Sequence, residues 1–270
     1  MGQESATIGA KCPNLVKGCL CGILLFIAAL VEPSSGFSQT LPQDVQKIVS
    51  QTGYRARLAL FDEFPVRPGD VVFLGDNLIQ QGQWDEIFVG VPVRNRGIWG
   101  DRVEAIQYRL YQISHYQPSA IILNIGANDL ASGRSVQQVV AEIDKIVGFL
   151  SEVVSPDHII IIGQPPLTAK AAPLIKRFNG ALAQMSRAKG VNYIDVFPAL
   201  VGRQDALYGS FAVDGRLLNG KGYRVIAEML LPYLIKIAGE QREAQQGFKG
   251  QDFDLTDPME ARTGVAAGGR

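Results

Sequence analysis

Cysteine, histidine and net charge are scarce in this sequence, and each scarcity excludes a class of protein. The three cysteines, Cys12, Cys19 and Cys21, all lie near the N-terminus. The rest of the chain can therefore form neither a disulfide nor a thiolate metal site. Lysine plus arginine and aspartate plus glutamate both number 26, so the net charge is zero. Because no basic stretch is interleaved with aromatic residues, we expect no nucleic-acid partner.

The N-terminal segment has the pattern of a secretory signal. Two lysines precede an apolar run at residues 19–31, and the small, polar stretch EPSSGFSQ follows it. This run fits the apolar region of a signal peptide but falls short of the roughly 20 residues of a spanning helix. We expect residues 1–38 to be a signal peptide and the protein to be exported, to a periplasm or to the cell exterior. A membrane anchor formed by residues 19–31 is the alternative.

Short apolar runs alternate with helical periodicities along the middle of the chain. This alternation, with short connections, predicts an α/β protein in three α/β/α layers with a five-stranded parallel sheet. The buried rather than alternating character of the runs supports parallel strands. The expected strands are VVFLG (71–75), VPVRNRG (91–97), SAIILNIG (119–126), HIIIIGQPP (158–166) and VNYIDV (191–196).

The periodicity also divides the chain into segments. Residues 39–61 are expected to form a helical lead-in, and residues 62–238 one α/β domain whose last helix spans about residues 221–237. Residues 239–270 are polar, Gly-rich and aperiodic, so a disordered tail is expected there. Within the domain, Val103, Ile106, Leu110 and Ile113 are spaced as on one face of a single helix.

Polar residues follow several of the expected strands, at the edge where parallel sheets bind ligands. Asp76 and Asn77 follow the first strand, Asn128 follows the third, and Asp214 lies in the loop before the last helix. Each residue alone is more simply explained as a helix cap or a turn residue. Four of them on one edge indicate a ligand site.

Four ordered blocks of sequence carry a resemblance to a known family. VVFLGDNLIQ, NRGIWGD, NIGANDL and DGRLLNGKGY resemble the blocks of SGNH (GDSL) hydrolases, most closely the bacterial relatives of platelet-activating-factor acetylhydrolase catalytic subunits. The resemblance covers roughly residues 62–237. It implies a flavodoxin-like strand order and ester chemistry that requires neither a cofactor nor a metal.

The same resemblance assigns roles to individual positions. Gly100 and Asn128 match the donors to the oxyanion, and Asp214 matches the catalytic aspartate. Asn77 stands at the position of the nucleophilic serine, and Leu217 at that of the histidine. An amide is not activated as a hydroxyl is, and leucine cannot accept a proton. We therefore predict a pseudoenzyme that keeps the ligand-binding positions, namely Asp76, Asn77, Gly100, Asn128 and Asp214.

Neither histidine of the chain is expected to replace the missing base. His115 and His158 each lie just before an expected strand, at the amino edge of the sheet. Ligands of parallel sheets bind at the opposite edge. Both histidines are therefore expected to be surface or loop residues.

Three functions remain open at this stage. The first is an inactive domain that binds an acylated or acetylated surface glycan, an exopolysaccharide or a partner protein. The second is an active carbohydrate or lipid O-acyl esterase in which Asp214 or Asp76 activates water. That enzyme needs a carboxyl group with a raised pKa, for which the sequence shows no reason. The third is a structural subunit that forms a homodimer, or a heterodimer with an active paralogue.

Overall fold

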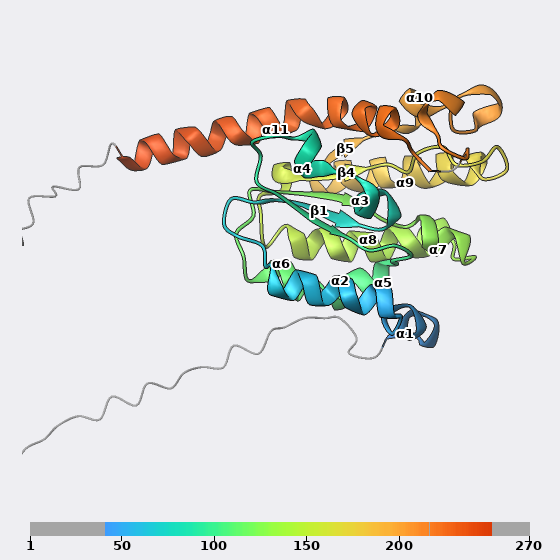
Figure 1. Cartoon of the computed structure of the whole chain (residues 1–270), viewed down its shortest axis with the longest axis horizontal. Helices are drawn as coiled ribbons and strands as arrows, with labels where there is room; N and C mark the ends of the chain where they lie inside the picture. The colour runs from blue at the N-terminus through green and yellow to red at the C-terminus, as the bar shows by residue number, and fades with distance from the viewer. Residues whose placement is uncertain (1–40, 216, 250–270) are drawn as a thin grey trace, which may run out of the picture. The chain divides into compact units, whose positions relative to one another are not determined.

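The computed structural model describes residues 41–215 and 217–249 (Figure 1). The expected signal segment, including the apolar run at residues 19–31, lies outside the described residues. Among the helices that the structure does describe, none combines the length and apolarity that crossing a membrane requires.

A five-stranded parallel sheet with the order β2-β1-β3-β4-β5 forms the centre of the molecule (Figure 1). This is the predicted flavodoxin-like order, and every neighbouring pair of strands is parallel. The strands are β1 (Val71–Gly75), β2 (Val93–Gly97), β3 (Ala120–Asn124), β4 (Ile159–Ile162) and β5 (Asn192–Ile194).

Helices cover both faces of the sheet. The described helices are α1 (Gln43–Val49), α2 (Thr52–Glu63), α3 (Asn77–Gln81), α4 (Trp84–Ile87), α5 (Val103–Tyr108), α6 (Tyr111–Ser114), α7 (Ala127–Ala131), α8 (Val136–Leu150), α9 (Ala172–Lys189), α10 (Phe197–Leu200) and α11 (Gly220–Lys249). Short 3-10 turns occur at η1 (Pro156–His158), η2 (Arg203–Asp205) and η3 (Gly209–Phe211).

The alternation of side chains along each strand divides the core into two parts. In β1, Val72 and Leu74 pack with residues of α5, α8 and α9. Val71 and Phe73 face the opposite layer, where they pack with residues of α3, α4 and α11. The sheet is therefore buried on both faces, which explains why its strands are continuous apolar runs.

A third, smaller cluster joins the N-terminal helices to the domain. Val45 of α1 and Tyr54 and Phe61 of α2 are buried together with Ile98 and Ala105. The expected helical lead-in thus packs against the segment that follows β2. This contact places α2 beside the candidate site.

Two helices differ from the sequence-based expectation. The helix expected to carry both Val103 and Ile113 is divided into α5 and α6, and Arg109, whose side chain is buried, lies at the break. The last helix continues to Lys249, so residues 239–249 are helical where disorder was expected. This extension is rich in Gln and Glu, good helix formers that extend an established helix at little cost.

Candidate functional site

Asn77 is placed at the carboxyl end of β1 by a tight turn into α3. The Asp76 side chain caps this helix, since its Oδ1 accepts a hydrogen bond from the Leu78 N–H at 3.3 Å. A Cβ atom on Gly75 would lie 2.0 Å from the carbonyl oxygen of Asn124, so only glycine lets the chain pass here. The turn thus begins α3 at the edge where parallel sheets bind ligands.

The side-chain oxygen of Asn77 accepts hydrogen bonds from both predicted oxyanion donors. Gly100 donates its backbone N–H at 2.7 Å, and Asn128 donates from Nδ2 at 3.4 Å. The Asn128 amide is shared further, with the Asp101 carbonyl at 3.0 Å and Asp76 Oδ2 at 3.3 Å. The two donors expected to face a reacting carbonyl therefore face Asn77, which stands at the position expected for the serine.

Leu217 contributes to the same site from the loop before α11. It is half-buried, and it lines a pocket of about 280 Å³ whose walls also include Asn77 and Asn128. The position expected for the histidine thus carries an apolar side chain in the wall of the pocket. Trp99, which is half exposed, and Gln164, which is buried, line the pocket as well.

Asp214 is linked to the pocket through Leu217. The side chain of Asp214 is exposed and is not among the lining residues of the pocket. Its Oδ1 accepts a hydrogen bond from the Leu217 N–H at 3.1 Å. Of the four residues predicted to converge, Asn77, Gly100 and Asn128 are joined directly by hydrogen bonds, whereas Asp214 is bonded to the loop that carries Leu217.

Asp76 has the most unusual environment in the site. Only 2% of its surface is exposed, and burial raises the pKa of its carboxyl group to about 8. The nearby carboxyl groups of Asp101 and Asp129 raise this pKa further, against the lowering effect of the Leu78 N–H. At neutral pH Asp76 is therefore mainly protonated. No feature of the sequence indicates this raised pKa, because burial is a tertiary property.

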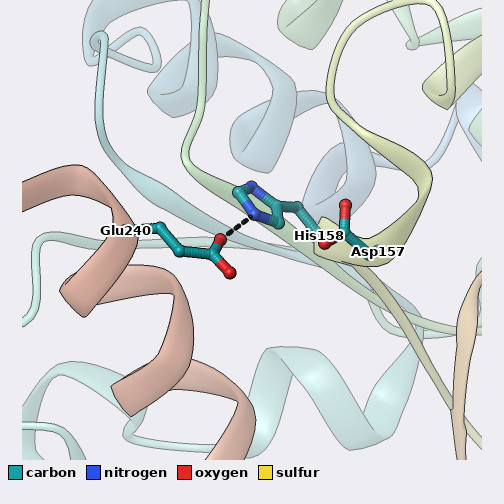
Figure 2. Close-up of side chains that lie close together, drawn as sticks. All are labelled: Asp157, His158 and Glu240. Carbon is teal, nitrogen blue, oxygen red and sulfur yellow. Dashed lines mark hydrogen bonds and ion pairs between the residues drawn. The ribbon is translucent and has the colours of Figure 1, made fainter. Parts of the chain in front are cut away.

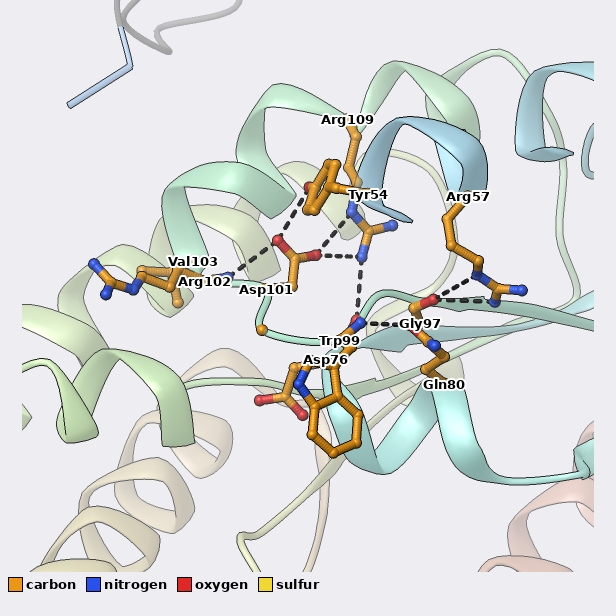
Figure 3. Close-up of polar contacts among 12 residues, drawn as sticks. Tyr54, Arg57, Asp76, Gln80, Gly97, Trp99, Asp101, Arg102, Val103 and Arg109 are labelled. Carbon is orange, nitrogen blue, oxygen red and sulfur yellow. Dashed lines mark hydrogen bonds and ion pairs between the residues drawn. The ribbon is translucent and has the colours of Figure 1, made fainter. Parts of the chain in front are cut away.

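A buried network supports the loop that carries Gly100 (Figure 3). Asp101 accepts two hydrogen bonds from the Arg109 guanidinium, at 2.7 and 2.9 Å, and one from the Tyr54 hydroxyl at 3.1 Å. Arg109 also donates to the Gly75 carbonyl at 3.2 Å, which ties the loop to β1. Burial raises the pKa of Asp101, and the charge of Arg109 opposes that rise.

Sequence reasoning missed this network, although its members bracket the recognised motifs. Tyr54 lies in α2, which was assigned to a lead-in outside the domain. Arg57, one turn further along α2, donates to the Gly97 carbonyl at 3.0 and 3.2 Å (Figure 3). The available signal was the presence of Tyr54 and Arg57 three residues apart in the lead-in, where both could contact the domain. The lead-in helix thus holds the loop after β2.

Both histidines lie away from the pocket, at the predicted positions. His115 is exposed before β3, and His158 precedes β4 at the amino end of that strand. His158 Nε2 lies 2.8 Å from Glu240 Oε2 on α11 (Figure 2). Neither histidine therefore reaches the pocket that contains Asn77.

Among the described residues, Asp157, His158 and Glu240 form a group that is close enough to hold a metal ion (Figure 2). Lys236 already lies between the two carboxylates, with Nζ 3.3 Å from Asp157 Oδ2 and 3.5 Å from Glu240 Oε1. A protein cation thus takes the place that a metal would need. We interpret the group as a structural tie between α11 and the start of β4.

Comparisons with known proteins identify the family to which this fold belongs. The model of the GDSL-like Lipase/Acylhydrolase family matches residues 45–225. The chain belongs to this family. This GDSL-like protein is 25% identical over 202 residues to the platelet-activating factor acetylhydrolase IB subunit alpha1 of Homo sapiens, covering 70% of this chain and 82% of the relative.

Solved structures share the fold of this GDSL-like protein. A GDSL-like lipase from Bacteroides thetaiotaomicron superimposes with a TM-score of 0.60 at 18% identity, covering 69% of this chain and 99% of the other. An acetylxylan esterase from Geobacillus stearothermophilus superimposes with a TM-score of 0.51 at 15% identity, covering 62% and 96%. The predicted α/β fold and family are therefore confirmed.

Proposed function

We propose that this GDSL-like protein is a catalytically inactive member of its family that binds an acetylated or acylated glycan. The observation that carries the proposal is the position of the Asn77 side chain. Its carbonyl oxygen accepts from the Gly100 N–H at 2.7 Å, so a residue that cannot act as a nucleophile occupies an expected oxyanion donor. Leu217, in the wall of the same pocket, offers no proton acceptor.

The size of the pocket supports a small acyl group as the bound moiety. At about 280 Å³ the pocket is slightly smaller than the roughly 300–1,000 Å³ typical of small-molecule sites. An acetyl group fits such a space. The acetylxylan esterase among the structural neighbours makes an acetylated glycan a reasonable ligand class. Export, proposed from residues 19–31, would bring the protein to such polymers.

The test combines turnover with binding. The full chain is incubated with p-nitrophenyl acetate, and its affinity for acetylated xylobiose is measured by isothermal titration calorimetry. We expect no hydrolysis above the buffer rate, together with binding that weakens when Trp99 at the pocket wall is replaced by Ala. Steady turnover of the ester, or no binding of the acetylated sugar, would contradict the proposal.

One observation favours a second candidate, an esterase in which a carboxylate activates water. Asp76 lines the pocket and has a pKa raised to about 8, as a general base acting near neutral pH requires. In that case hydrolysis should survive Asn77→Ala, rise with pH toward about 8 and disappear in Asp76→Asn. If Asp214 is the base instead, Asp214→Asn abolishes hydrolysis and Asp76→Asn does not.

A further inference from the structure

A second and larger pocket adjoins the one that contains Asn77. Its volume is about 710 Å³, within the range of about 300–1,000 Å³ typical of small-molecule sites. It lies between α11 and the segment that includes α3 and α4. Gln81, Leu218 and Tyr223 line both pockets, so the two share a wall. A ligand that is too large for the 280 Å³ pocket can therefore extend into its neighbour.

The base of the large pocket is apolar and rigidly held. Phe88, Leu218 and Tyr223 are each less than a tenth exposed. Tyr223 is fixed by its hydroxyl, which donates to the Leu78 carbonyl at 3.1 Å, and by an edge contact with Trp84. The base is thus a preformed surface on which the apolar face of a ligand can pack.

The walls of the large pocket carry polar side chains without protein partners. Gln81, Gln83 and Glu86 line one side, and Arg224 and Glu228 line the α11 side. None of these five side chains forms a hydrogen bond or ion pair with another residue in the part of the chain that the structure describes. Even Arg224 and Glu228, one helical turn apart, are not paired. Their donors and acceptors are therefore available to a ligand.

The charges of these walls decide between classes of ligand. Two carboxylates, Glu86 and Glu228, stand against one guanidinium, Arg224. A slightly acidic wall disfavours ligands with a net negative charge, such as phosphomonoesters and anionic lipid head groups. Amide and carboxylate groups around an apolar base suit a neutral polyhydroxylated chain, whose hydroxyl groups donate and accept while its ring faces pack on the base.

We infer that the large pocket binds a neutral oligosaccharide chain, and that an acetyl group of the chain enters the adjoining pocket. The position of the acetyl group rests on the proposed function, whereas the binding of the chain does not. Gln81, Leu218 and Tyr223 form the wall along which the ligand passes from one pocket to the other. The glycan backbone is recognised by Gln83 on one side and Glu228 on the other.

The experiment measures how affinity depends on chain length. Unsubstituted xylobiose and xylohexaose are titrated into the full chain by calorimetry. Two added hydrogen bonds should make the hexamer bind about tenfold more tightly than the dimer. In Gln83→Ala/Glu228→Ala this gain should fall to about twofold or less. Equal affinity of the two sugars for the wild-type protein overturns the inference, as does a length-dependent gain that persists in the double variant.

A matched variant controls for nonspecific changes at the same surface. Asp85→Ala/Lys221→Ala removes exposed side chains from α4 and α11 that do not line the pocket. It should keep the full length-dependent gain, and both double variants should melt within about 2 °C of the wild type, as surface substitutions do. Loss of the gain in this control overturns the inference.

Acetylated sugars separate this inference from the proposed function. If xylohexaose binds with the expected dependence on Gln83 and Glu228 but acetylation of xylobiose adds no affinity, the large pocket is a glycan site and the proposed function fails. If acetylated xylobiose binds but lengthening the chain adds nothing, the proposed function stands and this inference is overturned. Binding of phosphatidylcholine vesicles without any binding of xylohexaose also overturns it.

Discussion

The Oδ1 atom of Asn77 accepts a hydrogen bond from the backbone N–H of Gly100 at 2.7 Å. In an active relative this donor is expected to face the oxygen of the reacting ester. Here the Asn77 side chain satisfies it internally, and Asn128 Nδ2 donates to the same oxygen at 3.4 Å. At the position expected for the serine, Asn77 therefore offers no nucleophile, and its oxygen occupies the Gly100 donor. The first two predictions separate these effects.

Restoring the missing pair should restore hydrolysis. Asn77→Ser together with Leu217→His should hydrolyse p-nitrophenyl acetate measurably, while either change alone should not, because nucleophile and base act as a unit. The change to serine also removes the amide oxygen that accepts from the Gly100 N–H. This N–H can then donate to the negative charge that develops on the oxygen of the reacting ester. Adding Asn128→Ala should lower the rate a further hundredfold or so. A folded double variant without activity would show that the donors are no longer placed for catalysis.

Removing the Asn77 side chain without adding a nucleophile should make the Gly100 and Asn128 donors available to an anion. Asn77→Ala leaves the Gly100 N–H and the Asn128 amide without their shared acceptor. We expect methylphosphonate to bind about tenfold more tightly than to the wild type, as one recovered charge-assisted hydrogen bond implies. Titration followed by phosphorus NMR measures this. Asn77→Asp is the matched control, because its carboxylate keeps the donors occupied and repels the anion. An equal gain in both variants would contradict the explanation.

The protonation of Asp76 should make stability depend on pH. Its pKa is about 8 in the folded protein and near 3.9 in an unfolded chain, so the folded state binds more protons between these values. Its contribution to the unfolding free energy is fully present below pH 4 and is lost as the pH rises through about 8. Titration of this one group changes the unfolding free energy by at most about 1.4 kcal/mol per pH unit.

Asp76→Asn isolates this contribution from that of other carboxyl groups. Asp129, whose pKa is raised to about 6 mainly by burial, also lowers stability as the pH rises, and it remains in the variant. Urea unfolding at intervals from pH 4 to 9 should show a shallower decline for Asp76→Asn than for the wild type. Parallel curves would mean that Asp76 is ionised throughout.

Removing only one member of the buried Asp101–Arg109 ion pair should strongly lower the free energy of unfolding. Arg109→Met leaves the Asp101 carboxylate buried without its cation, which typically costs about 3–5 kcal/mol. Adding Asp101→Asn should recover part of this loss, because the amide removes the charge and can still accept from Tyr54. Chemical denaturation measures both variants. A double variant less stable than Arg109→Met would contradict this account.

The sequence by itself determined the five-stranded sheet and the edge of the sheet at which the candidate site residues lie. Five apolar runs gave five strands, because a parallel strand buried on both faces must be apolar throughout. Asn77, Gly100 and Asn128 could be placed at one edge, because the carboxyl ends of parallel strands share an edge. The last helix was underestimated at its C-terminus, where local composition has no apolar face but favours helix extension.

Only the tertiary structure decided what those site residues do to one another. That the Asn77 oxygen occupies the Gly100 donor depends on a distance between two segments 23 residues apart. The pKa of Asp76 depends on burial beneath several elements, and the Tyr54–Asp101–Arg109 network joins a helix before the recognised motifs to the loop within them. Hydrogen bonds and desolvation act over a few ångströms in space, and sequence spacing does not encode that proximity.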